Sequence, residues 1–147
     1  MTFRNDVEAV LPGAYAEGLR ALSPADRRRV SARDTRTISG SANIDAALAA
    51  VDPGEPRWDY AIGQKRSHRE RIHWVEVHPA SGRACIEQVE AKLRWLVRWL
   101  RSSLLGGYPR TIVWIATGRS AFNARDPAIK RLAQHGCQFV GRNLSIP

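Results

Sequence analysis

The chain has 147 residues, of which 44% are hydrophobic and 25% charged, and its formal net charge at pH 7 is +9. This length and apolar content suffice for one globular domain with a real core, and they argue against intrinsic disorder. The sequence has no apolar run of about 18 residues, and residues 1–13 lack the apolar segment of a signal peptide, so we expect neither a membrane span nor secretion.

The excess of basic residues favours a polyanionic partner, most simply nucleic acid. All but three of the 23 basic residues are arginine, a bias that coding composition can also produce. The two cysteines, Cys85 and Cys137, form no CxxC motif. Without a secretion signal they are expected to be reduced and buried in a cytoplasmic protein.

The N-terminal part is predicted to be helical and basic. Residues 4–22 favour helix with an interruption at Pro12, and Ser23 followed by Pro24 is typical of the start of another helix. The strongly basic segment 27–41 follows, and its second half is a candidate short strand. We therefore expect residues 1–40 to form an extension of a core over residues 41–147, within a single domain.

The first half of that core is predicted to be a helix followed by two strands. The helix begins after Ser41 or Asn43 and ends near Pro53. Residues 57–64 and 71–79 alternate in the manner of strands. The charged turn between these two strands is short, so they should be antiparallel.

The second half is predicted to alternate between helices and strands. The longest helix spans about residues 83–103, and strands are expected at 111–117 and 137–144, with a helix at 126–136 between them. The predicted buried stripe of the long helix consists of Ile86, Val89, Leu93, Leu96 and Leu100. Because this helix connects two strands, the second should run parallel to the first. The prediction is an α/β fold, a mixed β-sheet flanked by helices on both faces.

Two carboxylates stand out because of their places in the predicted strands. Glu76 shares a strand face with Ile72 and Trp74, since residues i and i+2 point to the same side. On that apolar face a carboxylate is costly unless it is paired or bound to a metal. Asp59 lies in the preceding strand, and a hairpin would bring both acids to the sheet rim. Two acids plus a backbone carbonyl suit Mg²⁺ or Mn²⁺, which can activate water against a phosphodiester.

This order of elements, with an Asp in one strand and an acid–x–base pair in the next, resembles the PD-(D/E)xK nuclease-like superfamily over residues 41–117. The resemblance implies a restriction-endonuclease-like αββαβ core with a helical N-terminal extension. It also implies that Asp59 and Glu76 bind the metal. The sequence "SGSANIDAAL…RWDY…VEVHPA" is in addition similar to uncharacterised bacterial proteins, from which no activity can be transferred.

The chain departs from the family's motif at two positions. Residue 58 is Trp where the motif has Pro, and His78 stands where the family's lysine would orient the attacking water. In some members the lysine is thought to come from the following helix, and Lys92 is the candidate substitute. Lys65, six residues after Asp59, is a second one.

Each of these residues also has a structural interpretation. Asp59 can pair with an arginine across the hairpin, namely Arg57, Arg66 or Arg71. Glu76 can form a structural ion pair with Lys92, and His78 can be an ordinary rim histidine.

Candidate phosphate contacts come from the basic segments. The residues are Lys65, Arg66 and Arg69 in the charged turn, and Arg33 and Arg36 in the N-terminal segment. The alternative for both segments is a solvated basic face. Trp95 and Trp99, four residues apart, favour core or interface packing over base stacking and leave a homodimer open.

The leading hypothesis is a divergent metal-dependent nuclease-like protein that acts on nucleic acid phosphodiesters. In it, Asp59 and Glu76 bind Mg²⁺ or Mn²⁺, and Lys92 or His78 orients or activates water. The alternative is a catalytically inactive nuclease-fold module that binds nucleic acid or a protein partner.

Overall fold

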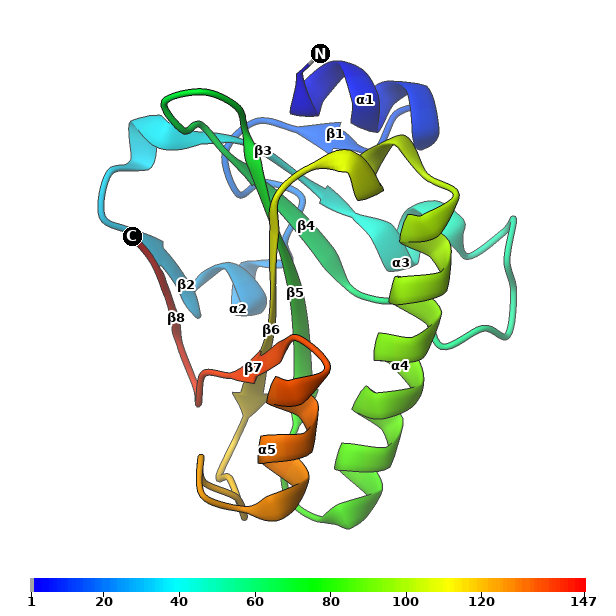
Figure 1. The fold of residues 1–147 in the computed structure, drawn as a ribbon. Coiled ribbons are helices and arrows are strands. Elements are labelled where there is room, and N and C mark those ends of the chain that lie inside the picture. The colour runs from blue at the N-terminus through cyan, green and yellow to red at the C-terminus, as the bar shows by residue number, and fades with distance from the viewer. Residues whose placement is uncertain (1) are drawn as a thin grey trace.

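The computed structural model describes residues 2–147, which form a mixed six-stranded sheet with helices packed against it (Figure 1). In spatial order the strands are β1 (Tyr15–Ala16), β3 (Ile38–Asn43), β4 (Tyr60–Gln64), β5 (Arg71–Pro79), β6 (Arg110–Thr117) and β7 (Cys137–Phe139). Neighbours from β1 to β5 are antiparallel, whereas β5, β6 and β7 run parallel. The α/β class, the antiparallel hairpin and the parallel crossover are thus confirmed.

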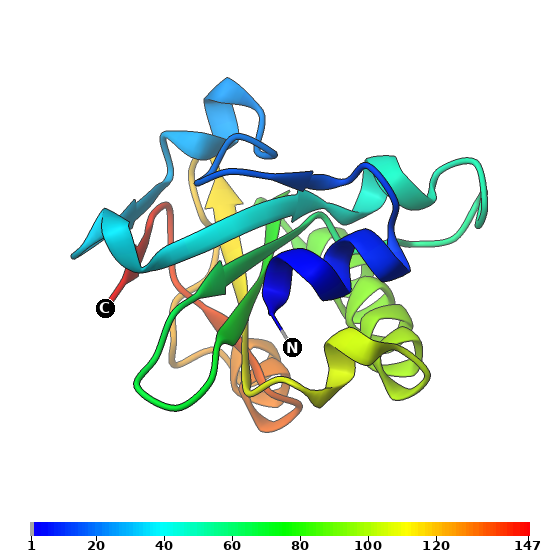
Figure 2. The same cartoon turned by 90° about the horizontal axis from the view of Figure 1, so that it is seen from above.

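One face of the sheet is covered by four helices, α1 (Phe3–Val10), α3 (Ile44–Leu48), α4 (Arg83–Arg101) and α5 (Pro127–Gln134). Figure 2 shows α1, α4 and α5 on the same side of the sheet. The predicted stripe of α4 is buried throughout and packs on this face with Trp74 and Trp114. This core places α4 directly over β5.

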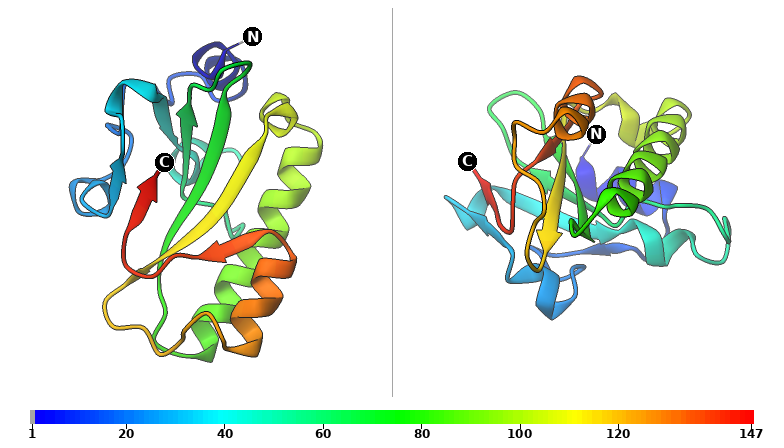
Figure 3. Two further views of the ribbon diagram at one scale, coloured as in Figure 1. Left: turned by 60° about the vertical axis from the view of Figure 1, so that its left-hand side comes forward. Right: turned by 90° about the horizontal axis from the view of Figure 1, so that it is seen from below.

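The opposite face is covered by short segments, not by a layer of long helices. The parallel strands β2 (Val30–Ala32) and β8 (Leu144–Ile146) pack on it beside the single-turn helix α2 (Pro24–Arg27), as the left view of Figure 3 shows. Two 3₁₀ turns complete the fold, at Thr35–Thr37 and Leu104–Gly107. No helix within residues 2–147 is long and apolar enough to cross a lipid bilayer.

Several element boundaries differ from the prediction. Only the first part of 4–22 is helical, and a turn at Pro12 and Gly13 leads instead into β1. The expected last strand is two strands, β7 and β8, because Gly141 makes a turn at φ 76°. The helix predicted to end near Pro53 is shorter, because α3 ends at Leu48, and Val51 beyond it is 78% exposed.

Candidate active site

Glu76 is held inside the fold by the pleat of β5. Its side chain points, as predicted, to the same face as Ile72 and Trp74, towards α4, and none of it is exposed. The carboxylate has three partners: it accepts from Lys92 Nζ, from the Asp59 backbone N–H at 3.2 Å, and lies 3.5 Å from His78 Nδ1. These contacts offset the cost of burying a charged group.

Asp59 is the residue just before β4, whereas it was predicted to lie within that strand. From this position its carboxylate approaches Glu76. Its backbone carbonyl accepts from the Ile44 N–H at the start of α3 (2.8 Å), which fixes the chain at this point. Its carboxylate accepts from the Val77 N–H at 3.0 Å and lies 3.4 Å from Lys92 Nζ. Burial, and after it the charge of Glu76, raises the pKa of Asp59 to about 7.

Lys92 enters from α4, on the flank next to the buried stripe. Its ammonium group bonds Glu76 and Asp59 together, so one cation lies between two carboxylates. Burial opposes the charged form, but the two neighbouring carboxylates outweigh burial and raise the pKa of Lys92. The arrangement therefore keeps the ammonium charged.

His78 closes the rim of this cluster. Its Nε2 pairs with Gln88 Oε1 of α4 at 2.7 Å, and its Nδ1 faces Glu76. The hydrogen bond to Glu76 raises the pKa of His78, against the effect of burial. The side chains of Asp59, Lys92 and His78 are 21%, 18% and 18% exposed, so solvent reaches the site from their side and not from Glu76.

The structure thus brings together all four residues predicted as catalytic or metal-binding. Asp59 does not pair across the hairpin with Arg57, which instead bonds Asp45 at 3.0 Å. We call the cluster of Asp59, Glu76, His78 and Lys92 the acidic site.

The donor set of the acidic site is compatible with a hard cation. Both carboxylates face one point, and that point already attracts the ammonium group. Within residues 2–147 no group of three or more His, Cys, Asp or Glu side chains is arranged to hold a metal. An ion would need further oxygen ligands from backbone carbonyls, water or substrate, which is how Mg²⁺ is usually bound.

The predicted phosphate contacts lie elsewhere. Lys65, Arg66 and Arg69 line an open pocket of about 840 Å³ at the hairpin end of β4 and β5. From Arg71 to Glu76 the strand rises about 17 Å, so this end is remote from the acidic site.

The N-terminal pair of predicted contacts does not reach the acidic site either. Arg36 lies at the same end of the sheet as Lys65, whose backbone N–H donates to the neighbouring Thr37 carbonyl. The Arg36 guanidinium group is paired with the Asp34 carboxylate at 3.0 Å. Arg33 N–H bonds Ile146 O of β8. The five basic residues therefore do not surround the acidic site.

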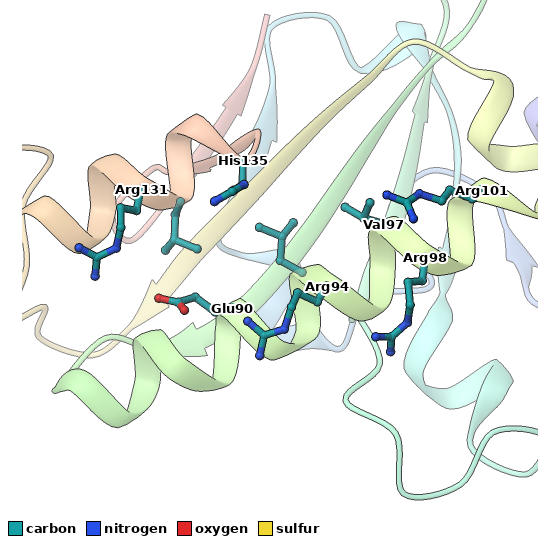
Figure 4. Close-up of a pocket in the computed structure, with 9 residues that line it drawn as sticks. Glu90, Arg94, Val97, Arg98, Arg101, Arg131 and His135 are labelled. Carbon is teal, nitrogen blue, oxygen red and sulfur yellow. The ribbon is translucent and has the colours of Figure 1, made fainter.

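The structure also shows a basic groove that the sequence interpretation did not identify. It lies between α4 and α5, has a volume of about 510 Å³, and Figure 4 shows the side chains that line it. Four of them are arginines: Arg94, Arg98, Arg101 and Arg131. The three on α4 lie on the exposed face of the helix, outside its buried stripe. Only the packing of α5 beside α4 turns that face into a groove.

Comparisons with protein-family models, with curated proteins and with solved structures found no match to this chain.

Proposed function

We propose that the chain is a divergent metal-dependent nuclease-like protein of the PD-(D/E)xK type, acting on nucleic acid phosphodiesters. The observation that carries the proposal is the convergence of Asp59, Glu76 and Lys92 at one partly exposed point. Glu76 comes from β5 and Lys92 from α4, and Asp59 is the residue just before β4. An unrelated structural ion pair needs only two of the three.

In this proposal Asp59 and Glu76 hold Mg²⁺ or Mn²⁺. The bound ion supplies Lewis-acid chemistry, polarising a phosphoryl oxygen and lowering the pKa of a water. With a pKa of about 7, Asp59 is close to half protonated at neutral pH, and a bound cation would favour its ionised form.

Lys92 and His78 supply the proton and charge chemistry. With its raised pKa, Lys92 stays charged, so it can orient a water or stabilise negative charge that develops on the phosphate. His78 is within reach of Glu76 and Gln88, and it can exchange a proton with solvent at the rim.

A second function, a catalytically inactive binding module, is favoured by one specific observation. Glu76 has no exposed surface and its carboxylate is already paired with Lys92. In that case the acidic site is a structural ion-pair network, and the basic surface alone binds the partner.

Mn²⁺ binding measured by calorimetry, together with cleavage of labelled DNA and RNA, separates the two functions. Wild type should bind Mn²⁺, alone or with a short oligonucleotide, and cleave. Glu76→Gln should lose both properties. Lys92→Met removes the competing ammonium, so the folded variant, verified by circular dichroism, should keep or strengthen Mn²⁺ binding and lose cleavage. Glu55→Gln, a change of an exposed acid outside the site, is the control.

Folded wild type that binds no Mn²⁺, even with oligonucleotide present, would overturn the nuclease proposal and leave the binding module. Mn²⁺ binding that persists in Glu76→Gln would place the ion elsewhere and overturn the assignment of the acidic site.

A further inference from the structure

The groove between α4 and α5 concentrates positive charge. Arg94, Arg98 and Arg101 come from α4 and Arg131 from α5, and all four side chains are exposed. Within residues 2–147, none of their guanidinium groups has a carboxylate within 4.0 Å. Glu90 is the one acidic residue among the lining residues, so the cations outnumber the acid by four to one.

The spacing of these arginines follows from the helix. Positions 94, 98 and 101 lie on one flank of α4 and extend about 10 Å along its axis. One strand of B-form DNA carries a phosphate every 3.4 Å or so along its axis, so this length matches about three nucleotide steps. Arg131 adds a cation from the facing wall (Figure 4).

The residues at the floor of the groove indicate which kind of partner it binds. Its apolar residues are Leu93 and Leu132, which are 5% and 2% exposed, and the partly buried Val97. An amphipathic protein helix needs apolar anchors that enter exposed pockets, whereas the two leucines of this floor, Leu93 and Leu132, are buried. Guanidinium groups instead match phosphate oxygens with paired hydrogen bonds.

We infer that the α4–α5 groove binds the phosphate backbone of a nucleic acid strand. This inference rests on the proposed function only for the class of partner. Lys92 lies on the opposite flank of α4 from the groove arginines, so the groove is a surface separate from the acidic site. Binding there requires neither metal nor catalysis.

The test is equilibrium binding of fluorescent single-stranded and duplex oligonucleotides, followed by anisotropy in EDTA over a series of salt concentrations. The groove variant is Arg94→Gln/Arg101→Gln/Arg131→Gln. The matched control, Arg28→Gln/Arg119→Gln/Arg142→Gln, removes the same charge from exposed arginines outside the groove. Circular dichroism checks that both variants are folded, and Arg131→Gln alone provides a milder change.

We expect the groove variant to bind at least about tenfold more weakly than the control variant. The slope of log K against log salt should fall in magnitude by about 2 to 3, since roughly 0.9 counterions are released per phosphate neutralised. Equal affinity and slope in the two variants would overturn the groove assignment.

The outcomes also separate this inference from the proposed function. Nucleic acid binding that is insensitive to the groove variant would reject the groove alone. Sensitivity to the groove variant without any metal-dependent cleavage would reject the nuclease alone. Wild type that binds an acidic polypeptide such as polyglutamate but no oligonucleotide would reject nucleic acid as the partner in both.

Discussion

Replacing Lys92 by methionine should destabilise the protein strongly, because it leaves two carboxylates facing each other without a cation. Lys92 is the only ammonium within 4.0 Å of Glu76 or Asp59 in residues 2–147. Glu76 has no exposed surface, so water cannot replace the lost partner there. Removing one member of a buried ion pair typically costs roughly 3–5 kcal/mol.

The loss in Lys92→Met should depend on pH in a defined direction. Asp59 has a folded pKa of about 7, above its ordinary value of 3.8, and removal of Lys92 takes away an interaction that lowers it. The native state therefore binds more protons than the unfolded state over this range. Stability falls as pH rises through the folded pKa. Lowering the pH from about 8 to about 6 should recover part of the lost stability.

A double-mutant cycle isolates the pair itself. Glu76→Gln removes the buried charge, so Lys92→Met/Glu76→Gln should be more stable than the sum of the two single changes predicts, by at least about 1 kcal/mol. Lys130→Met is the matched control, since Lys130 is exposed on α5 and should change stability by no more than about 0.5 kcal/mol.

The assay is urea unfolding followed by tryptophan fluorescence, for which the chain provides five tryptophans. Trp74 and Trp99 pack edge to face at 6.0 Å on the same side of the sheet as Lys92, so their emission reports on this region. If Lys92→Met were as stable as Lys130→Met, or the cycle showed no coupling, the paired arrangement of the acidic site would be refuted.

Three further predictions concern residues outside the acidic site. Burial, with the charges of nearby arginines, lowers the pKa of His73 from 6.5 to about 4. Between these two pH values the native state binds fewer protons than the unfolded state. His73 therefore contributes about 3 kcal/mol of stability above pH 6.5 that is lost as the pH falls through 4. The change in the free energy of unfolding between the two ends of this range, measured by urea unfolding, should differ by that amount between wild type and His73→Asn, because the opposite contribution of Asp59 is common to both proteins. A hydrogen bond from Ser81 lowers the pKa of Cys85, whereas burial raises the pKa of Cys137 to about 12. Mass spectrometry after iodoacetamide treatment of the native protein at neutral pH should therefore find one adduct, at Cys85. Two adducts would contradict the burial of Cys137. A Cβ at Gly106 would meet Leu100 O at 2.0 Å, whereas one at Gly107 meets nothing within 4 Å; thermal unfolding should show Gly106→Ala destabilised by roughly 1–3 kcal/mol and Gly107→Ala nearly unchanged.

The core of the fold could be predicted from the sequence because its patterns are strong and local. The alternation in β5 and the apolar stripe of α4 each fix which face of the element is buried. Weaker signals failed where tertiary contacts decide the structure. The strand β2 has three residues and pairs with β8, whose sequence is 114 positions away, so no local pattern could reveal either.

The site divides in the same way. The anomaly of Glu76, an acid on an apolar strand face, was visible in the sequence, and so was the position of Lys92 on the flank of the helix stripe. The basic residues were predicted to contact phosphate from their charge alone, and charge does not show where in the fold a residue lies relative to Glu76. Lys65, Arg66 and Arg69 are at one end of the hairpin and Glu76 is near the other, a separation that the number of strand residues between them already implied.

The placement of Lys92 follows from an ordinary constraint on βα units. With His78 at the end of β5, the position that would carry a lysine directly beside Glu76 is already filled by an imidazole. The helix that follows must cross back over the same strand to reach β6, so its inner flank passes the carboxylate. Gln88 and Lys92, one turn apart on that flank, reach His78 and Glu76 respectively. A lysine on α4 can therefore supply the cation without any change in the strands, and Lys92 is the lysine in the chain that meets this geometric condition.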